Sequence, residues 1–110
     1  QRLVRKVCDQ CKKEYAAPKN LIKAIGLPES TKKLFKGVGC QTCYHTGNKG
    51  RTGIFEILEV TPEVRRMIAS DAPVEEIAKS GKMKTMADRC RQKVKQGIVA
   101  PEEFLRVIRA

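Results

Sequence analysis

Residues 61–110 contain four segments in which apolar residues recur at helical spacing, separated by short breaks. Thr61, Pro73, Thr85 and Pro101 stand at the expected helix starts, because threonine caps a helix N-terminus and proline fits its first turn. Each predicted helix is too short to be stable alone in water. We therefore expect the four helices to pack on one another through their apolar faces.

The first half of the chain shows shorter and less regular patterns. The apolar spacing in residues 1–7 predicts the end of a helix. Proline and glycine bound a short predicted helix over residues 18–26. A short strand is predicted to start at Leu34-Phe35 and to lead through Gly37 and Gly39 into the second cysteine pair. Another is predicted over residues 54–60, where β-branched and aromatic side chains are frequent.

Four of the five cysteines form two pairs with two residues between the members, Cys8 with Cys11 and Cys40 with Cys43. This spacing lets both sulfurs of a pair point at one centre, and two such pairs complete a tetrahedral metal shell. Because no ligand position stays open, we expect a structural Zn²⁺ site. Iron in a rubredoxin-like site, a redox role and a disulfide role are the alternatives.

The sequence pattern changes near residue 60, which predicts an α+β fold in two parts. Residues 1–60 would form the zinc-binding tetracysteine subdomain, with short strands and helices and the end of an upstream core helix. Residues 61–110 would form a mainly α-helical C-terminal subdomain. With 110 residues the core would be thin, so a metal would contribute substantially to its stability.

Cys90 and His45 are the two other residues with metal-binding or nucleophilic chemistry that we consider. Cys90 lies on the apolar stripe of a predicted helix, which favours a buried free thiol over a reactive one. His45 follows the last cysteine pair closely and could replace one sulfur. Because four cysteines already fill the shell, we expect His45 to lie at the surface or to support the ligands.

The formal charge of +11 comes mainly from the first half of the chain. Residues 1–50 carry eleven Lys/Arg against three acids, whereas residues 51–110 carry twelve against nine. One zinc ion and four thiolates would lower the total by two, to +9. The excess fits an acidic partner, a nucleotide-bearing neighbour, an anionic membrane surface or nucleic acid, or simply a solvated basic surface.

The segment lacks the sequence motifs of most enzymatic reactions. Its one Gly-Lys pair, Gly81-Lys82, lacks the other positions of a phosphate-binding loop, and the glycine-rich residues 47–53 predict a tight hairpin instead. No paired carboxylates, Cys–His dyad or Ser–His–Asp set stands out, so we expect no activity from the segment alone. Lacking a signal segment and a long apolar run, it looks like part of a larger cytoplasmic protein.

The glycine–arginine signature after the second cysteine pair resembles the C-terminal region of the traffic ATPases of type II secretion and type IV pilus assembly. The resemblance covers nearly the whole chain, with Asn48 standing where an aromatic residue is common. It is carried by three stretches: Gln1-Arg2-Leu3-Val4-Arg5 before the first cysteines; Gly39-Cys40-x₂-Cys43-x₃-Gly47-x₂-Gly50-Arg51-x-Gly53-Ile54-x-Glu56-x-Leu58; and Lys93-Val94-x₂-Gly97-Ile98-x₃-Glu102-Glu103-x₂-Arg106-Val107.

The resemblance implies a parent protein that is a hexameric ATPase at the cytoplasmic face of the bacterial inner membrane. Its ATP/Mg²⁺ site would lie upstream of Gln1, and turnover would move an inner-membrane platform protein during pilin or pseudopilin assembly. The partners of this segment would be its own ATPase core, neighbouring subunits and the platform protein, with no transmembrane segment. In that family the four cysteines hold zinc.

Basic residues of the first half are candidates for contact with an acidic loop of the platform protein. The candidates are Lys12, Lys13, Lys32, Lys33, Lys36, Lys49 and Arg51. The alternative function is an independent zinc-ribbon module that binds nucleic acid, which the charge supports. Tyr15, Phe35 and Tyr44 offer a poor platform for stacking bases, so we expect nucleic acid binding to be the weaker interpretation.

Overall fold

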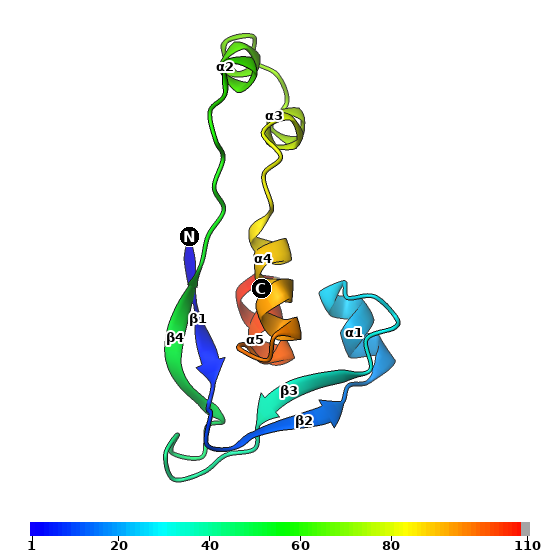
Figure 1. The fold of residues 1–110 in the computed structure, drawn as a ribbon, viewed down its shortest axis with the longest axis vertical. Coiled ribbons are helices and arrows are strands. Elements are labelled where there is room, and N and C mark those ends of the chain that lie inside the picture. Colours follow the sequence, from blue (N-terminus) through cyan, green and yellow to red (C-terminus); the bar gives the residue numbers. More distant parts are fainter. Residues whose placement is uncertain (109–110) are drawn as a thin grey trace.

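The computed structural model describes residues 1–108 and confirms the α+β fold class. Four strands form two antiparallel two-stranded sheets (Figure 1). In one sheet β1 (Arg2–Val7) pairs with β4 (Asn48–Ile54). In the other, β2 (Lys12–Ala16) pairs with β3 (Lys33–Gly37).

Five short helices complete the secondary structure of the described residues. None of them is long and apolar enough to cross a membrane. They are α1 (Lys19–Ile25), α2 (Pro62–Ala69), α3 (Val74–Ser80), α4 (Met86–Lys95) and α5 (Pro101–Ile108).

The helix starts follow the predicted capping residues. The Thr61 hydroxyl accepts a hydrogen bond from the Val64 N–H at 3.2 Å, and Pro62 is the first residue of α2. At α4, Thr85 and Asp88 form a reciprocal capping box. The helix predicted from Pro18 is confirmed as well, and it ends at Gly26 in a left-handed conformation.

The molecule is elongated, with extents of 54 × 28 × 21 Å. Helices α2 and α3 lie together at one end, and two connecting segments, residues 55–61 and 81–85, join them to the other elements (Figure 1). We call α2, α3 and these two segments the arm. At its base the Glu56 carboxylate accepts a 2.7 Å hydrogen bond from the Met86 N–H, the first residue of α4.

The C-terminal helices pack on one another in two pairs, α2 with α3 and α4 with α5, but the second pair also packs on the first half of the chain. Helix α4 contacts β3 and β4, and α5 contacts β1, β3 and α1. One continuous core therefore joins both halves of the chain, and the division at residue 60 stays a prediction. The most deeply buried side chains of this core include Val4, Ile25, Leu34, Ile54, Cys90, Val94, Val99 and Phe104.

The prediction of a helix over residues 1–7 is wrong, because these residues form β1. Val4 and Val7 are both buried, and the three-residue interval between them imitates helical spacing. Val7 is the last residue of β1, where the pairing with β4 shifts register because Lys49 and Gly50 of β4 together stand opposite Lys6. At this strand end the Val7 N–H donates to the Ile98 carbonyl at 2.9 Å, so Val7 is buried outside the regular alternation of β1.

The strand predicted at residues 54–60 is also misplaced. The strand covers Asn48–Ile54 and thus occupies most of the predicted glycine hairpin. Residues 55–60 are extended but have no ladder partner among the described residues, and Ile57 is 68% exposed. Pairing with β1 therefore outweighed the local β propensity of the segment that follows.

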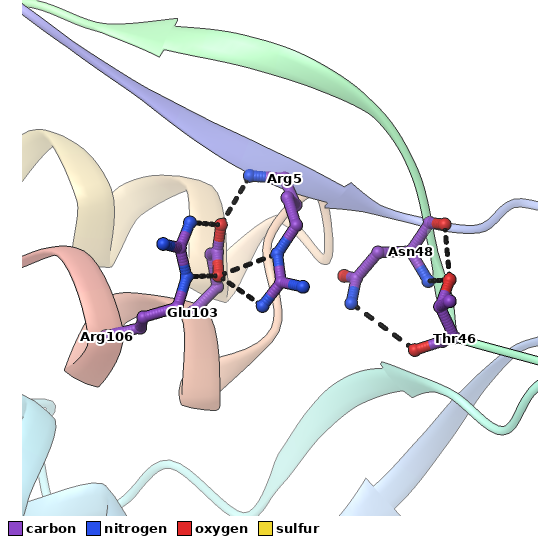
Figure 2. A network of polar contacts seen from close by, with 5 residues as sticks. All are labelled: Arg5, Thr46, Asn48, Glu103 and Arg106. Atoms are coloured by element: carbon purple, nitrogen blue, oxygen red, sulfur yellow. Dashed lines mark hydrogen bonds and ion pairs between the residues drawn. The ribbon is translucent and has the colours of Figure 1, made fainter.

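A buried carboxylate fixes α5 against β1 (Figure 2). Glu103 is 2% exposed and accepts hydrogen bonds from the Arg5 backbone N–H at 2.6 Å and from the Arg5 guanidinium at 3.0 and 3.1 Å. Arg106 adds two more at 2.7 and 2.8 Å. Burial raises the pKa of Glu103, but these bonds outweigh it and lower the pKa to about 2.

Candidate metal centre

The four paired cysteines meet at the corner where the two sheets join. The first pair lies on the turn between β1 and β2, and the second on the loop between β3 and β4 (Figure 1). The sulfurs of Cys8, Cys11, Cys40 and Cys43 all lie within 4.8 Å of one another. The structure therefore assembles the predicted ligand set from positions separated by 32 residues in sequence.

The spacing of the sulfurs fits a tetrahedral ion. Cys8 and Cys40 are 3.8 Å apart, Cys11 and Cys43 are 3.8 Å apart, and Cys40 and Cys43 are 3.7 Å apart. Four sulfurs at about 2.3 Å from a central ion would be separated by about 3.8 Å. These sulfurs are well beyond disulfide bonding distance, and all four cysteines are free.

Backbone N–H groups point at two of the sulfurs. The Cys40 and Gly47 amides donate to Cys43 Sγ at 3.3 and 3.2 Å, and the Gly39 amide donates to Cys11 Sγ at 3.3 Å. Hydrogen bonds of this kind stabilise the charged thiolate, which is the form that binds metal. Sequence analysis did not predict these donors, because they depend on how the loops fold back on the cysteines.

The thiols differ in acidity. Burial raises the pKa of Cys11 to about 11, even though the Gly39 amide acts in the opposite direction. Burial also acts to raise the pKa of Cys43, but hydrogen bonds from the Cys40 and Gly47 amides outweigh burial and lower the pKa to about 6. A divalent cation between the sulfurs would favour the thiolate at every position. The donor set thus fits a soft or borderline divalent metal such as zinc.

Two glycines let the loops of the centre come together. A β-carbon on Gly37 would lie 2.1 Å from the Gly47 carbonyl oxygen, and one on Gly47 would lie 2.4 Å from the Gly37 oxygen. Gly47 also has a φ of +79°, which disfavours other residues. The same Gly47 carbonyl also accepts a hydrogen bond of 3.0 Å from the Cys8 N–H.

The other two candidate residues lie outside the cluster. His45 is exposed and does not belong to the four-sulfur group, although its backbone helps form the left-handed turn after Cys43. Cys90 is fully buried in α4 as part of the hydrophobic core. Burial is the main cause that raises the pKa of Cys90 to about 11, which keeps it as an unreactive thiol.

The predicted basic contact residues separate into two groups. Five lie on or beside the sheet of β2 and β3, where Lys12 and Lys36 stack over the rings of Phe35 and Tyr15 at 5.0 and 4.8 Å. The other two, Lys49 and Arg51, lie on β4 in the other sheet. The second cysteine pair, Cys40 and Cys43, lies between the two groups along the chain.

The sequence also matches a family description, "Type II/IV secretion system protein", over residues 1–106. This match covers nearly the whole chain and agrees with the glycine–arginine signature after Cys43. The chain belongs to the type II/IV secretion system protein family. Membership of this secretion family confirms the resemblance seen in the sequence.

Several curated members of the secretion family are similar to this chain. The type IV pilus assembly ATPase PilB of Thermus thermophilus is 40% identical over 96% of this chain, and PilB of Pseudomonas aeruginosa is 39% identical over 97%. The type II secretion system ATPase E of Vibrio cholerae is 39% identical over 97%. The chain spans 12%, 20% and 22% of the lengths of these three relatives.

Proposed function

We propose that Cys8, Cys11, Cys40 and Cys43 bind a structural Zn²⁺ ion. The observation that carries this proposal is the near-tetrahedral spacing of the four sulfurs, three of which are buried. All four positions of the shell are supplied by the protein, so none is left for a catalytic water.

The chain would serve as the C-terminal metal-binding and helical part of a secretion or pilus-assembly ATPase. Residues 1–60 would form the zinc subdomain and residues 61–110 the helical subdomain of that parent. ATP and Mg²⁺ would bind elsewhere in the parent, and this segment would carry no catalysis of its own. The support is the family match together with relatives whose names denote ATPases of pilus assembly and secretion.

Zinc would make the junction between the two sheets rigid. The ion would connect the turn that joins β1 to β2 with the loop that joins β3 to β4. A hydrogen bond of 2.9 Å from the Val7 N–H to the Ile98 carbonyl extends this junction to the segment before α5. Movement of the ATPase core could then reach a partner surface without local unfolding of the segment.

The basic side chains would contact an acidic loop of an inner-membrane platform protein at the cytoplasmic face. Lys13 and Lys32 are exposed and form no ion pair among the described residues, so their charges are available to a partner. Neighbouring subunits of a hexamer and the parent's own core would provide the other contacts. Through this contact ATP hydrolysis in the core would be coupled to pilus or pseudopilus assembly.

The partner contact can be tested in the full-length parent by reversing the charges of Lys13 and Lys32 to glutamate. Because complementary charges attract across an interface, we expect binding to the platform protein to fall at least tenfold and assembly to decrease. The double reversal of Lys79 and Lys82 to glutamate, at exposed positions on and just after α3, changes the charge equally and is the matched control. Unchanged binding and assembly in the double variant would show that these lysines do not form the contact.

Nucleic acid binding is less well supported by the surface. Lysine ammonium groups lie over the rings of Tyr15 and Phe35, which limits stacking of bases on them, and Tyr44 stands apart on the exposed turn after the cysteines. A gel-shift titration at two salt concentrations separates the two functions. Tight binding that weakens steeply with salt would favour nucleic acid as the partner.

A further inference from the structure

A recess of about 320 Å³ lies on the sheet of β1 and β4, next to the metal centre. Its lining combines three cationic side chains with a hydroxyl, an amide and a glycine, and includes no acidic residue. The lining residues are Arg5, Thr46, Asn48, Lys49, Gly50 and Arg51. The last two of these belong to the glycine–arginine signature, for which the proposed zinc site gives no role.

The strand register brings two arginines together at the recess. Arg5 of β1 stands directly opposite Arg51 of β4, although like charges in this position destabilise a sheet. The β-bulge lies immediately beside this pair, and Gly50 occupies it with a φ of +79°. Bulges often redirect side chains near functional sites, and Lys49, Gly50 and Arg51 at this bulge all line the recess.

Glu103 holds the Arg5 guanidinium at the edge of the recess. It accepts bonds from Arg5 Nε and Nη2, and Figure 2 shows Arg5 between Glu103 on one side and Asn48 on the other. Nη1 of Arg5 takes no part in these bonds. Because Glu103 is shared with Arg106, one negative charge balances two arginines, and a net positive charge remains beside the recess.

Lys49 and Arg51 contribute two more positive charges. Both side chains are exposed, and neither forms an ion pair within residues 1–108. A single carboxylate would neutralise only part of this charge, whereas a phosphate group carries about two negative charges at neutral pH. Guanidinium groups also match phosphate oxygens with paired hydrogen bonds.

We propose that Arg5, Lys49 and Arg51 form a binding site for a phosphate group, carried either by a nucleotide or by a free polyphosphate. The recess is at the small end of the range for ligand pockets, which suits a phosphate chain. Arg5 is the positioned cation, since Glu103 fixes its orientation. Lys49 and Arg51 are exposed and supply the other two positive charges. This site does not depend on the zinc or on the contact of Lys13 and Lys32 tested above, and it assigns Lys49 and Arg51 to a phosphate instead of to the acidic loop of the partner.

Calorimetric titration of the zinc-loaded chain with pyrophosphate, at low and moderate salt, tests the site. Arg51→Gln and Lys49→Gln should each weaken binding at least tenfold, and moderate salt should weaken binding to the original chain. Lys13→Gln removes the same charge from exposed β2 outside the recess and should change affinity less than twofold. Far-UV spectra should be unchanged in all three variants, because the three side chains are exposed.

The source of the phosphate is distinguished by a parallel titration with ATP. Equal affinity for ATP and pyrophosphate would support a site for phosphate alone, and tighter ATP binding would support a nucleotide site that also contacts the base. Absence of saturable binding to either ligand would overturn the proposal. Equal losses in Lys13→Gln and Arg51→Gln would overturn it too, since the attraction would then be diffuse. Stronger binding of a glutamate-rich peptide, lost in Arg51→Gln, would assign the recess to an acidic partner instead.

Discussion

Gly47 and Gly50 have the same left-handed backbone conformation but different surroundings. Both have a φ of +79°. A β-carbon on Gly47 would lie 2.4 Å from the Gly37 carbonyl oxygen, whereas one on Gly50 would have no atom nearer than 3.8 Å. The pair therefore separates the cost of the left-handed conformation from the cost of a clash at the metal centre.

We expect Gly50→Ala to lower the free energy of unfolding by about 1 to 2 kcal/mol, which is the cost of the left-handed conformation alone. Gly47→Ala should cost about 1 to 3 kcal/mol more, because the loops must also move apart. It should weaken metal binding as well, since the Gly47 amide donates to Cys43. Chemical denaturation and competition with a zinc indicator measure both effects. Equal stability of the two variants would show that the Gly37–Gly47 contact is unimportant.

Glu103 makes the stability of the folded chain depend on pH in the acidic range. Its pKa is lowered to about 2 in the folded protein, whereas the ordinary value is 4.5. Its stabilising contribution is therefore complete above about pH 4.5 and is lost as the pH falls towards 2. The shift corresponds to about 3 kcal/mol, and solvent at the half-exposed arginines reduces the expected loss to about 2 kcal/mol.

Glu103→Gln tests this dependence, because glutamine cannot ionise. The stability difference between the original chain and the variant should shrink by about 2 kcal/mol between pH 5 and pH 2. Comparing the two proteins at each pH cancels the loss of metal that acid causes in both. A stability difference that stays constant over this range would mean that Glu103 is not held as an anion by Arg5 and Arg106.

Helices were the elements that sequence predicted best. Thr61, Thr85 and Gly26 act at helix ends through local hydrogen bonds or backbone conformation, so their effect is readable without tertiary information. Strands β1 and β4 were misassigned, because their limits depend on a long-range pairing and on a bulge. The apolar spacing of residues 1–7 is compatible with either element until that pairing is known.

The candidate site also has a part that the sequence predicts and a part that depends on tertiary structure. The four ligands follow from cysteine spacing alone, which is a local signal. The bond from the Gly39 amide to Cys11 and the pairing of Arg5 with Glu103 connect segments 28 and 98 residues apart. In the sequence, Glu103 stands out only as one position of the C-terminal stretch that resembles the secretion family. Its partner Arg5 lies 98 residues away and carried no signal for the pairing.

Two helix caps should have different effects on stability. Thr85 caps α4, whose Cys90 and Val94 are fully buried in the core, whereas α2 buries only Val64. Thr85→Ala should therefore lower the global free energy of unfolding by about 1 kcal/mol. Thr61→Ala should instead lower protection of α2 amides alone, because the arm can open locally. Native-state hydrogen exchange distinguishes the two cases, and equal loss of α4 protection in both variants would contradict local opening.

At the scale of the whole molecule, the arm and the rest of the chain differ in how they are held together. Helices α1, α4 and α5 and the two sheets share a core, and the four cysteines lie at the corner of those sheets. The arm has no comparable core, and its Ile68 and Val74 are 50% and 77% exposed. The proposed zinc ion should accordingly stabilise the two sheets most directly, while the arm responds little to its removal.

The most direct test of the structural zinc site measures metal and structure together. X-ray absorption of the purified chain should show one zinc ion bound by four sulfurs at about 2.3 Å. Removal of the metal with a strong chelator should then unfold the two sheets, seen as a large change in the far-UV circular dichroism spectrum. A far-UV spectrum that stays the same after the metal is confirmed to be lost would contradict the structural role.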